Sequence, residues 1–225
     1  MKTFKLSPSS FSFLYEGCKH CFYLNVVHNI KQPSMPLPGV FSIMASLQKN
    51  HYDGMRTELI HPGIPSGLVS HGEKFVKSKI IKSSRYDSSC YISGRFDIAA
   101  TFDNGSYGVI DFKTGNPKEE SNQLYKRQLS AYAFALENPE LGALNMSPVS
   151  KIGLIYFPPL KTIHRANDKM LYETGIHWYE LEYNDKDFLR FIDEVLNILD
   201  KPTPPNPSPD CLWCNYVNQI KTIKK

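Results

Sequence analysis

Residues 94–115 read GRFDIAATFDNGSYGVIDFKTG and carry the strongest fold signal in the chain. Two apolar stretches flank Asp103-Asn104-Gly105, and such a sequence between apolar stretches is typical of a tight hairpin turn. The pattern predicts one strand over 91–102 and another over 107–112. Each strand carries an aspartate, Asp97 on the first and Asp111 on the second, and Lys113 follows Asp111 by two positions.

The turn decides whether the two aspartates can meet. If Asn104-Gly105 alone forms a two-residue turn, Asp97 lies opposite Phe112 and the carboxylates point to opposite faces. If residues 103–105 form a three-residue loop with Gly105 left-handed, Asp97 lies opposite Asp111 and the side chains share a face. We expect the second arrangement, or an equivalent bulge.

Two adjacent carboxylates repel each other and stay ionised only when a cation lies between them. Oxygen ligands in an incomplete shell suit Mg²⁺ or Mn²⁺, which can polarise a phosphodiester. On a regular strand Lys113 shares the face of Asp111, so its ammonium can neutralise charge that develops on phosphate oxygens. The plainer alternative is a surface ion pair at a strand end, the more frequent origin of an Asp-x-Lys triplet.

A helix is predicted over 123–137, ended by Asn138-Pro139. Gln128 and Tyr132 lie four residues apart on it and therefore on one face, with Tyr125 on the same side. An amide and a phenol beside a metal site can hold a water molecule and a phosphate oxygen. The alternative is that Tyr132 belongs to the core and Gln128 caps a buried polar group.

Shorter patterns complete the expected fold. Helices are predicted at 40–48 and 187–199, and another begins at Ser7-Pro8. Strands are predicted at 75–81, 152–157 and 176–183, whereas 31–39 is interpreted as a connector and 51–72 mostly as loop. This order favours an α/β (α+β) fold with a mixed central sheet flanked by helices.

Four of the five cysteines form two CxxC pairs near the chain ends, Cys18/Cys21 and Cys211/Cys214. In a reducing compartment this spacing indicates metal or cluster ligation before a disulfide. Residues 201–210 hold five prolines and form a stiff strap that can carry the second pair back to the first. Spacing alone does not choose between Zn²⁺ and an iron–sulfur cluster. Four unligated buried thiols are the alternative, and Cys90 is expected to pack as a small apolar residue.

Composition limits the remaining possibilities. The chain has 225 residues and a formal net charge of +4, which fits a polyanionic partner without requiring one. No apolar stretch approaches the roughly 18 residues of a membrane span, and the first residues lack the apolar core of a signal peptide. We therefore expect a cytoplasmic protein without membrane contact; the sequence names no protein partner.

The motifs together resemble the PD-(D/E)XK nuclease superfamily, in particular its RecB-type branch and the CRISPR-associated iron–sulfur exonucleases. Gly94-Arg-Phe-Asp97 matches "GxxD", Asp111-Phe-Lys113 matches "DxK", and Gln128-Leu-Ser-Ala-Tyr132 matches "QxxxY", in order. The resemblance implies a restriction-endonuclease-like core. It also implies a metal held by Asp97, Asp111 and the main-chain carbonyl of Phe112, with Lys113 catalytic and the QxxxY pair in support. Many relatives add an upstream acid or histidine. Glu73 and His51 are the candidates here, and neither is a clear match.

The same resemblance favours a 4Fe–4S cluster over Zn²⁺ at the four cysteines. Relatives use one N-terminal and three C-terminal cysteines, so Cys21 would replace the ligand missing after Cys214. The implied organisation is a single nuclease domain over 1–225, with a catalytic core at 70–160 and cysteine-bearing segments at 1–30 and 201–225. The implied activity is Mg²⁺- or Mn²⁺-dependent DNA hydrolysis. The implied enzyme is an exonuclease that acts on single-stranded or end-bearing DNA. The alternatives are a non-catalytic nucleic-acid-binding module and a protein adaptor.

Overall fold

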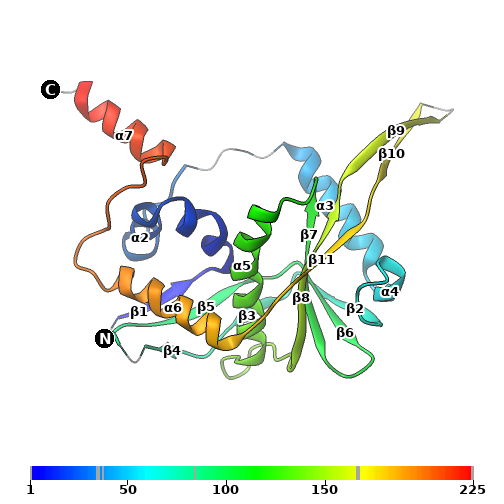
Figure 1. The fold of residues 1–225 in the computed structure, drawn as a ribbon, viewed down its shortest axis with the longest axis horizontal. Helices are drawn as coiled ribbons and strands as arrows, with labels where there is room; N and C mark the ends of the chain where they lie inside the picture. Colours follow the sequence, from blue (N-terminus) through cyan, green and yellow to red (C-terminus); the bar gives the residue numbers. More distant parts are fainter. Residues whose placement is uncertain (1, 34–35, 37, 84, 166–167, 224–225) are drawn as a thin grey trace.

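The computed structural model describes residues 2–33, 36, 38–83, 85–165 and 168–223 (Figure 1). Its centre is a five-stranded mixed sheet with the order β11-β8-β7-β6-β2. β7 and β8 are parallel, and the other neighbours are antiparallel. The strands span β2 Gly67–Gly72, β6 Ile98–Phe102, β7 Tyr107–Thr114, β8 Val149–Phe157 and β11 His177–Leu181.

A smaller sheet continues the structure toward the N-terminus. β5 is its central strand, parallel to β1 and antiparallel to β3 and β4. Its strands are β1 Thr3–Leu6, β3 Phe75–Lys77, β4 Ile81–Lys82 and β5 Ser89–Arg95. The mixed sheets and flanking helices confirm the predicted fold class.

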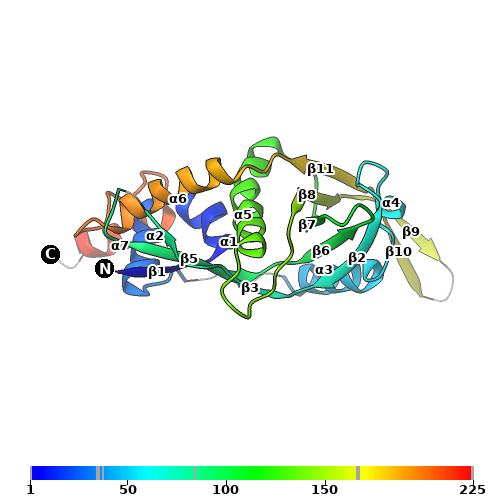
Figure 2. The ribbon, with the colours of Figure 1, turned by 90° about the horizontal axis from the view of Figure 1, so that it is seen from below.

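Helices cover both faces of the central sheet (Figure 2). α5 packs on β7 and β8 from one side, whereas α3 packs on β7, and α4 on β2, from the other. Two apolar clusters correspond to these sides: Val109 and Leu154 lie in the α5 cluster, and Ile110 and Phe112 in the α3 cluster. The helices are α1 Pro8–Ser10, the π-helix η1 Phe11–Tyr15, α2 Lys19–His28, α3 Gly39–Tyr52, α4 Thr57–Ile60, α5 Glu119–Glu137, α6 Asp185–Leu199 and α7 Leu212–Ile223.

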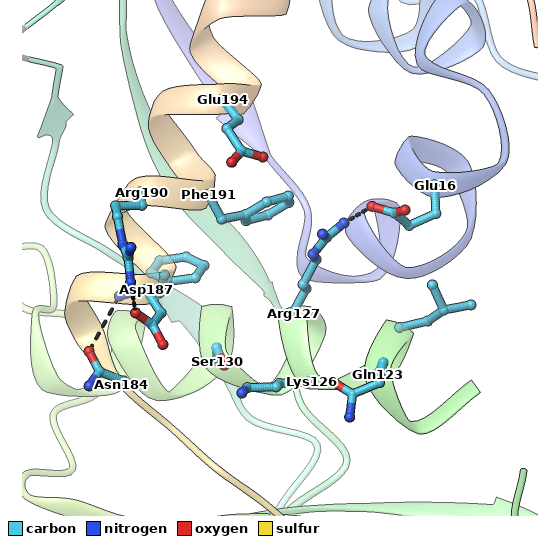
Figure 3. A pocket seen from close by; sticks show the side chains of 12 residues that line it. Glu16, Gln123, Lys126, Arg127, Ser130, Asn184, Asp187, Arg190, Phe191 and Glu194 are labelled. Atoms are coloured by element: carbon cyan, nitrogen blue, oxygen red, sulfur yellow. Dashed lines mark hydrogen bonds and ion pairs between the residues drawn. The ribbon is translucent and has the colours of Figure 1, made fainter. Parts of the chain in front are cut away.

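Arg127 joins three of these helices. From α5 its guanidinium lies over the ring of Phe191 on α6, 4.5 Å from the ring centroid, and it forms an ion pair with Glu16 just after η1 (Figure 3). These groups border a cavity of about 450 Å³ between α5 and α6. The contacts fix α5, which carries Gln128 and Tyr132, against the N-terminal segment.

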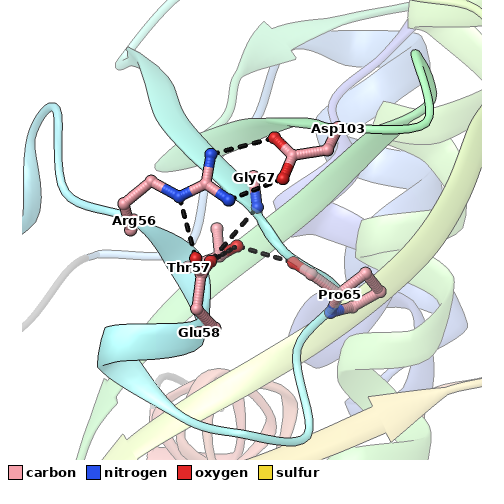
Figure 4. A network of polar contacts seen from close by, with 6 residues as sticks. All are labelled: Arg56, Thr57, Glu58, Pro65, Gly67 and Asp103. Carbon is pink, nitrogen blue, oxygen red and sulfur yellow. Dashed lines mark hydrogen bonds and ion pairs between the residues drawn. The ribbon is translucent and has the colours of Figure 1, made fainter.

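The turn between β6 and β7 is the predicted three-residue loop. Gly105 has φ +82°, and the register pairs Ile98 with Ile110 and Thr101 with Tyr107. Arg56, which is not part of the turn, donates two hydrogen bonds to the carboxylate of the turn residue Asp103, 2.9 and 2.6 Å long. It donates a third to Glu58 (Figure 4). A fork-to-carboxylate pair of this kind adds geometric specificity.

Three predicted segments were wrong in the elements that they contain. The strand expected over 91–102 is divided at Phe96-Asp97 into β5 and β6, which belong to different sheets. The strand expected over 75–81 is two short strands, and the region expected to be mostly loop contains α4 and β2. β2 was missed because Gly67 and Gly72 at its ends weaken any strand pattern, and its pairing with β6 is a non-local contact.

A hairpin of β9 Pro159–Arg165 and β10 Lys169–Thr174 was also not predicted. It projects away from the sheets in both views, and its base is closed by the bond from Gly175 N to Pro158 O, 3.0 Å. No helix among the described residues combines the length and apolar character that crossing a bilayer demands.

Candidate active site and cysteine site

Asp97 lies at the break between the two sheets. The β6–β7 register, continued by one residue, sets Asp97 opposite Asp111, as the three-residue turn predicts. Asp97 leaves the regular ladder there, and its main-chain oxygen accepts a hydrogen bond from Glu73 N at 2.9 Å. The break therefore turns Asp97 out of the sheet at the level of the second carboxylate.

Asp111 is buried near the end of β7, with 4% of its surface exposed. It shares its face with Lys113, and the two side chains form an ion pair. The ammonium contacts its Oδ2. The Lys113 ammonium also lies 3.9 Å from the ring centroid of Tyr125 on α5. A buried carboxylate is costly unless a cation compensates its charge, and Lys113 supplies one.

The pKa values of the two carboxyls move in opposite directions. The pKa of Asp111 is raised to about 7, chiefly by burial; Lys113 opposes this rise and Asp97 adds to it. For Asp97 burial acts upward too, but hydrogen bonding with Asp111 and with Lys49 outweighs it, and the pKa is lowered. This separation is expected of two acids that share one site.

Tyr132 and Gln128 support the site from behind. The Tyr132 hydroxyl donates to the main-chain oxygen of Arg95 at 2.7 Å, two residues before Asp97. Burial raises the pKa of Tyr132, and both aspartates act in the same direction. Gln128 accepts a 3.1 Å hydrogen bond from Ser12 on η1. Both side chains are buried; Tyr132 holds the segment that carries Asp97, and Gln128 joins α5 to η1.

Lys49 on α3 is a site residue that the sequence analysis missed. Its ammonium donates to Asp97 Oδ1 at 2.9 Å and to Glu73 Oε1 at 2.7 Å. Glu73 is thus brought to the site through Lys49, whereas the exposed ring of His51 packs on Tyr52, with centroids 4.8 Å apart. A lysine on a helix gives no local signal of this role, because the contact depends on how α3 packs on β7.

The two CxxC pairs come together. All four sulfur atoms lie within 4.8 Å of one another, with Cys21 Sγ 3.4 Å from Cys214 Sγ and 3.7 Å from Cys211 Sγ. The spacing of Cys18 and Cys21 is compatible with one shared helix, but Cys18 does not lie inside it. Cys18 immediately precedes α2, which contains Cys21. Cys211 likewise precedes α7. The site therefore lies at two helix N-termini, where the helix dipoles favour thiolates.

The strap from 201 to 210 is held along its length. Tyr23 donates to Lys201 O at 2.8 Å, His20 Nδ1 lies 2.8 Å from Pro205 O, and Ser208 N donates to Cys18 Sγ at 3.5 Å. Burial raises the pKa of Cys18, but main-chain donors at Ser208 and Cys21 outweigh it and lower the value to about 7. Burial raises the pKa of Cys21 to about 11.

Both sites fit a cation by the chemistry of their donors. At the first, two adjacent carboxylates, one of them buried, provide oxygen ligands, which suit a hard divalent ion. At the second, four buried free thiols converge, which suits Zn²⁺ or an iron–sulfur cluster.

Comparison with known proteins agrees with this geometry. The family model described as the PD-(D/E)XK nuclease superfamily matches residues 60–219. A search of the curated proteins gave no match. Among solved structures, the crystal structure of SSO0001 aligns at 16% identity over 89% of this chain and 78% of that one, with a TM-score of 0.42. A likeness of this size supports no argument about function.

Proposed function

The chain belongs to the PD-(D/E)XK nuclease superfamily, and from this premise we propose that it is a Mg²⁺- or Mn²⁺-dependent deoxyribonuclease. The superfamily indicates metal-dependent nuclease activity. The observation that supports the assignment to this chain is the buried carboxylate of Asp111 next to that of Asp97, with the ammonium of Lys113 beside them.

We assign the roles as follows. Asp97, Asp111 and the main-chain carbonyl of Phe112 hold the divalent ion, which when bound supplies Lewis-acid chemistry at the scissile phosphate. Lys113 stabilises negative charge that develops on the phosphate oxygens, since its ammonium already lies at the metal-binding carboxylate.

The supporting pair acts through the main chain. Tyr132 holds the Arg95 carbonyl and so keeps Asp97 level with Asp111, and Gln128 joins α5 to η1. These are positioning residues, because their polar atoms are turned toward protein groups. We propose that 1–225 acts as one nuclease unit with a catalytic core at 70–160, to which α3 adds Lys49.

Single-stranded or end-bearing DNA is the substrate that we propose, with exonucleolytic cleavage. The support for this substrate and mode of cleavage is the resemblance to RecB-type and CRISPR-associated exonucleases in the three motifs. At the four cysteines we propose a structural 4Fe–4S cluster in preference to Zn²⁺. Free thiols suit a reducing compartment such as the cytoplasm.

The test is cleavage of labelled single-stranded DNA by purified protein with Mg²⁺, Mn²⁺ or EDTA. We expect cleavage only with a divalent ion, and a loss of about 10²- to 10³-fold in Lys113→Met, because a preorganised charge at the phosphate is removed. In Asp111→Asn we expect Mn²⁺ binding, followed by calorimetry, to be lost while the metal-free melting temperature does not fall, because a buried carboxyl is replaced by a neutral group of the same shape.

Three outcomes would contradict the assignment. Cleavage that persists in Asp111→Asn identifies a contaminating nuclease. DNA binding without metal-dependent cleavage identifies a non-catalytic nucleic-acid-binding module. A stable protein partner, with neither DNA binding nor cleavage, identifies an adaptor.

A further inference from the structure

A polar cavity of about 670 Å³ opens between α3 and β2, next to the carboxylate pair. It shares Lys49 with the site, and Ile98, the residue after Asp97, forms part of its wall. Hydroxyl, amide and charged groups dominate the lining: Ser42, Ser46, Lys49, Asn50, Asp53, Ser70, Glu73 and Lys74, with Ala45, Val69, Gly72 and Ile98.

The helix side of this cavity is a row of hydrogen-bonding groups. Ser42, Ser46 and Asn50 recur at four-residue spacing on α3 and therefore lie along one face, which ends beside Lys49. Within the described parts of the chain, none of these three side chains makes a hydrogen bond, whereas Ser70 on the opposite wall is engaged with Thr101 at 2.8 Å. The row thus has free donors next to the candidate site.

Lys49 is the cation at the inner end of that row. Its side chain is 20% exposed and lies between two carboxylates, Asp97 and Glu73. Along the site the charges alternate from Glu73 through Lys49 to Asp97. A divalent ion bound to Asp97 would weaken the electrostatic attraction between that carboxylate and Lys49. The ammonium would then be available to a second anion.

We propose that this cavity is a subsite for a phosphate of the DNA strand next to the scissile one, with Lys49 as its cation and Ser42, Ser46 and Asn50 as its donors. The proposal rests on the proposed nuclease function and names where the substrate strand continues. A phosphodiester matches the α3 row and Lys49, because its oxygens accept from hydroxyl, amide and ammonium groups together. Glu73 positions the lysine: its main chain is bonded to Asp97, and its carboxylate holds the ammonium at the cavity wall.

The experiment measures binding of a fluorescent single-stranded oligonucleotide by anisotropy at several NaCl concentrations, in EDTA and in Ca²⁺. Each phosphate contact contributes about 0.7 to the slope of log K against log salt for a single strand. In Lys49→Met we expect weaker binding and a slope smaller by about that amount, whereas Lys49→Arg keeps the slope. The matched control is Lys77→Met, which removes an equal charge from a lysine paired with Glu140 at 2.6 Å, outside this cavity.

An unchanged slope in Lys49→Met, or an equal change in Lys77→Met, overturns the subsite. Thermal unfolding and Mn²⁺ binding are measured on the same variants. Mn²⁺ affinity that is kept or raised in Lys49→Met supports the proposal, because a positive charge beside the metal has been removed. A large fall of the melting temperature in both Lys49 variants counts against it. Failure of the proposed function is seen separately, as absence of metal-dependent cleavage by the unmodified protein.

Discussion

At the residue scale, the candidate site depends on which polar atoms are already engaged. Tyr132 and Gln128 are bonded to the main chain of Arg95 and to Ser12, whereas the carboxylates of Asp97 and Asp111 lie next to each other and to ammonium groups. This difference separates residues that position from residues that ligate. The QxxxY pattern predicted that Gln128 and Tyr132 lie next to the site. It did not predict the roles of the two side chains, because their partners, Arg95 and Ser12, are far from them in sequence.

Tyr132→Phe tests the positioning role. The change removes the bond to Arg95 O, and we expect it to lower stability by about 1 kcal/mol, the value of an ordinary hydrogen bond. Cleavage should fall further than the loss of folded protein explains, because Asp97 is no longer fixed. The control is Tyr23→Phe, which removes a bond of the same type to Lys201 O, away from the carboxylates. Equal loss of cleavage in the two variants would refute a local role.

At the element scale, the β6–β7 turn is the feature that fixes the site. Its three residues, with Gly105 left-handed, set the register that brings Asp97 level with Asp111. The Arg56–Asp103 pair holds the turn from the α4 side. A slip by one residue would turn every side chain of β6 to the opposite face.

Gly105→Ala should therefore affect both stability and cleavage. An alanine at φ +82° costs about 1 kcal/mol, although no atom lies near the added Cβ. For a chain of this size that corresponds to a fall of about 2–4 °C in melting temperature. Gly105→Asn should lose less, because asparagine tolerates the left-handed region. Thermal unfolding of both variants checks this order, and an alanine variant as stable as the asparagine variant would contradict it.

The sequence predicted this turn because its signal is local, and the same holds for α5 and α6. The helix predicted over 187–199 is α6, and its Phe188, Ile192, Val195 and Leu199 are all buried. The division at Phe96-Asp97 was not predictable, since both halves have strand-like residues and only pairing with different sheets separates them. Lys49 was missed for the same reason, because its two partners lie 24 and 48 residues away.

At the scale of the whole molecule, the four cysteines join segments from the two ends of the described chain. α2 and α7 each begin at the site, and the strap brings them together. An ion that binds only the folded protein stabilises it by about 1.4 kcal/mol for every tenfold excess over its Kd. The site should therefore contribute to the stability of regions far from the carboxylates.

Cys21→Ser should lower the content of bound iron or zinc and the melting temperature, and should expose the strap to limited proteolysis. Cys90→Ser serves as control for metal content, because Cys90 is buried elsewhere in the core. Metal analysis, visible absorption and proteolysis with mass spectrometry are the measurements. Equal metal content in the unmodified protein and Cys21→Ser would show that the cysteines are not ligands.

The separation of the two CxxC pairs has a consequence for biosynthesis. Cys21 and Cys211 are 190 positions apart, and the carboxylates, Lys49 and all five strands of the central sheet lie between them. During translation the first pair therefore leaves the ribosome long before the second. The sheet can assemble on the nascent chain, but the cysteine site can close only after the sheet has been synthesised, so its assembly reports that the intervening polypeptide has been completed.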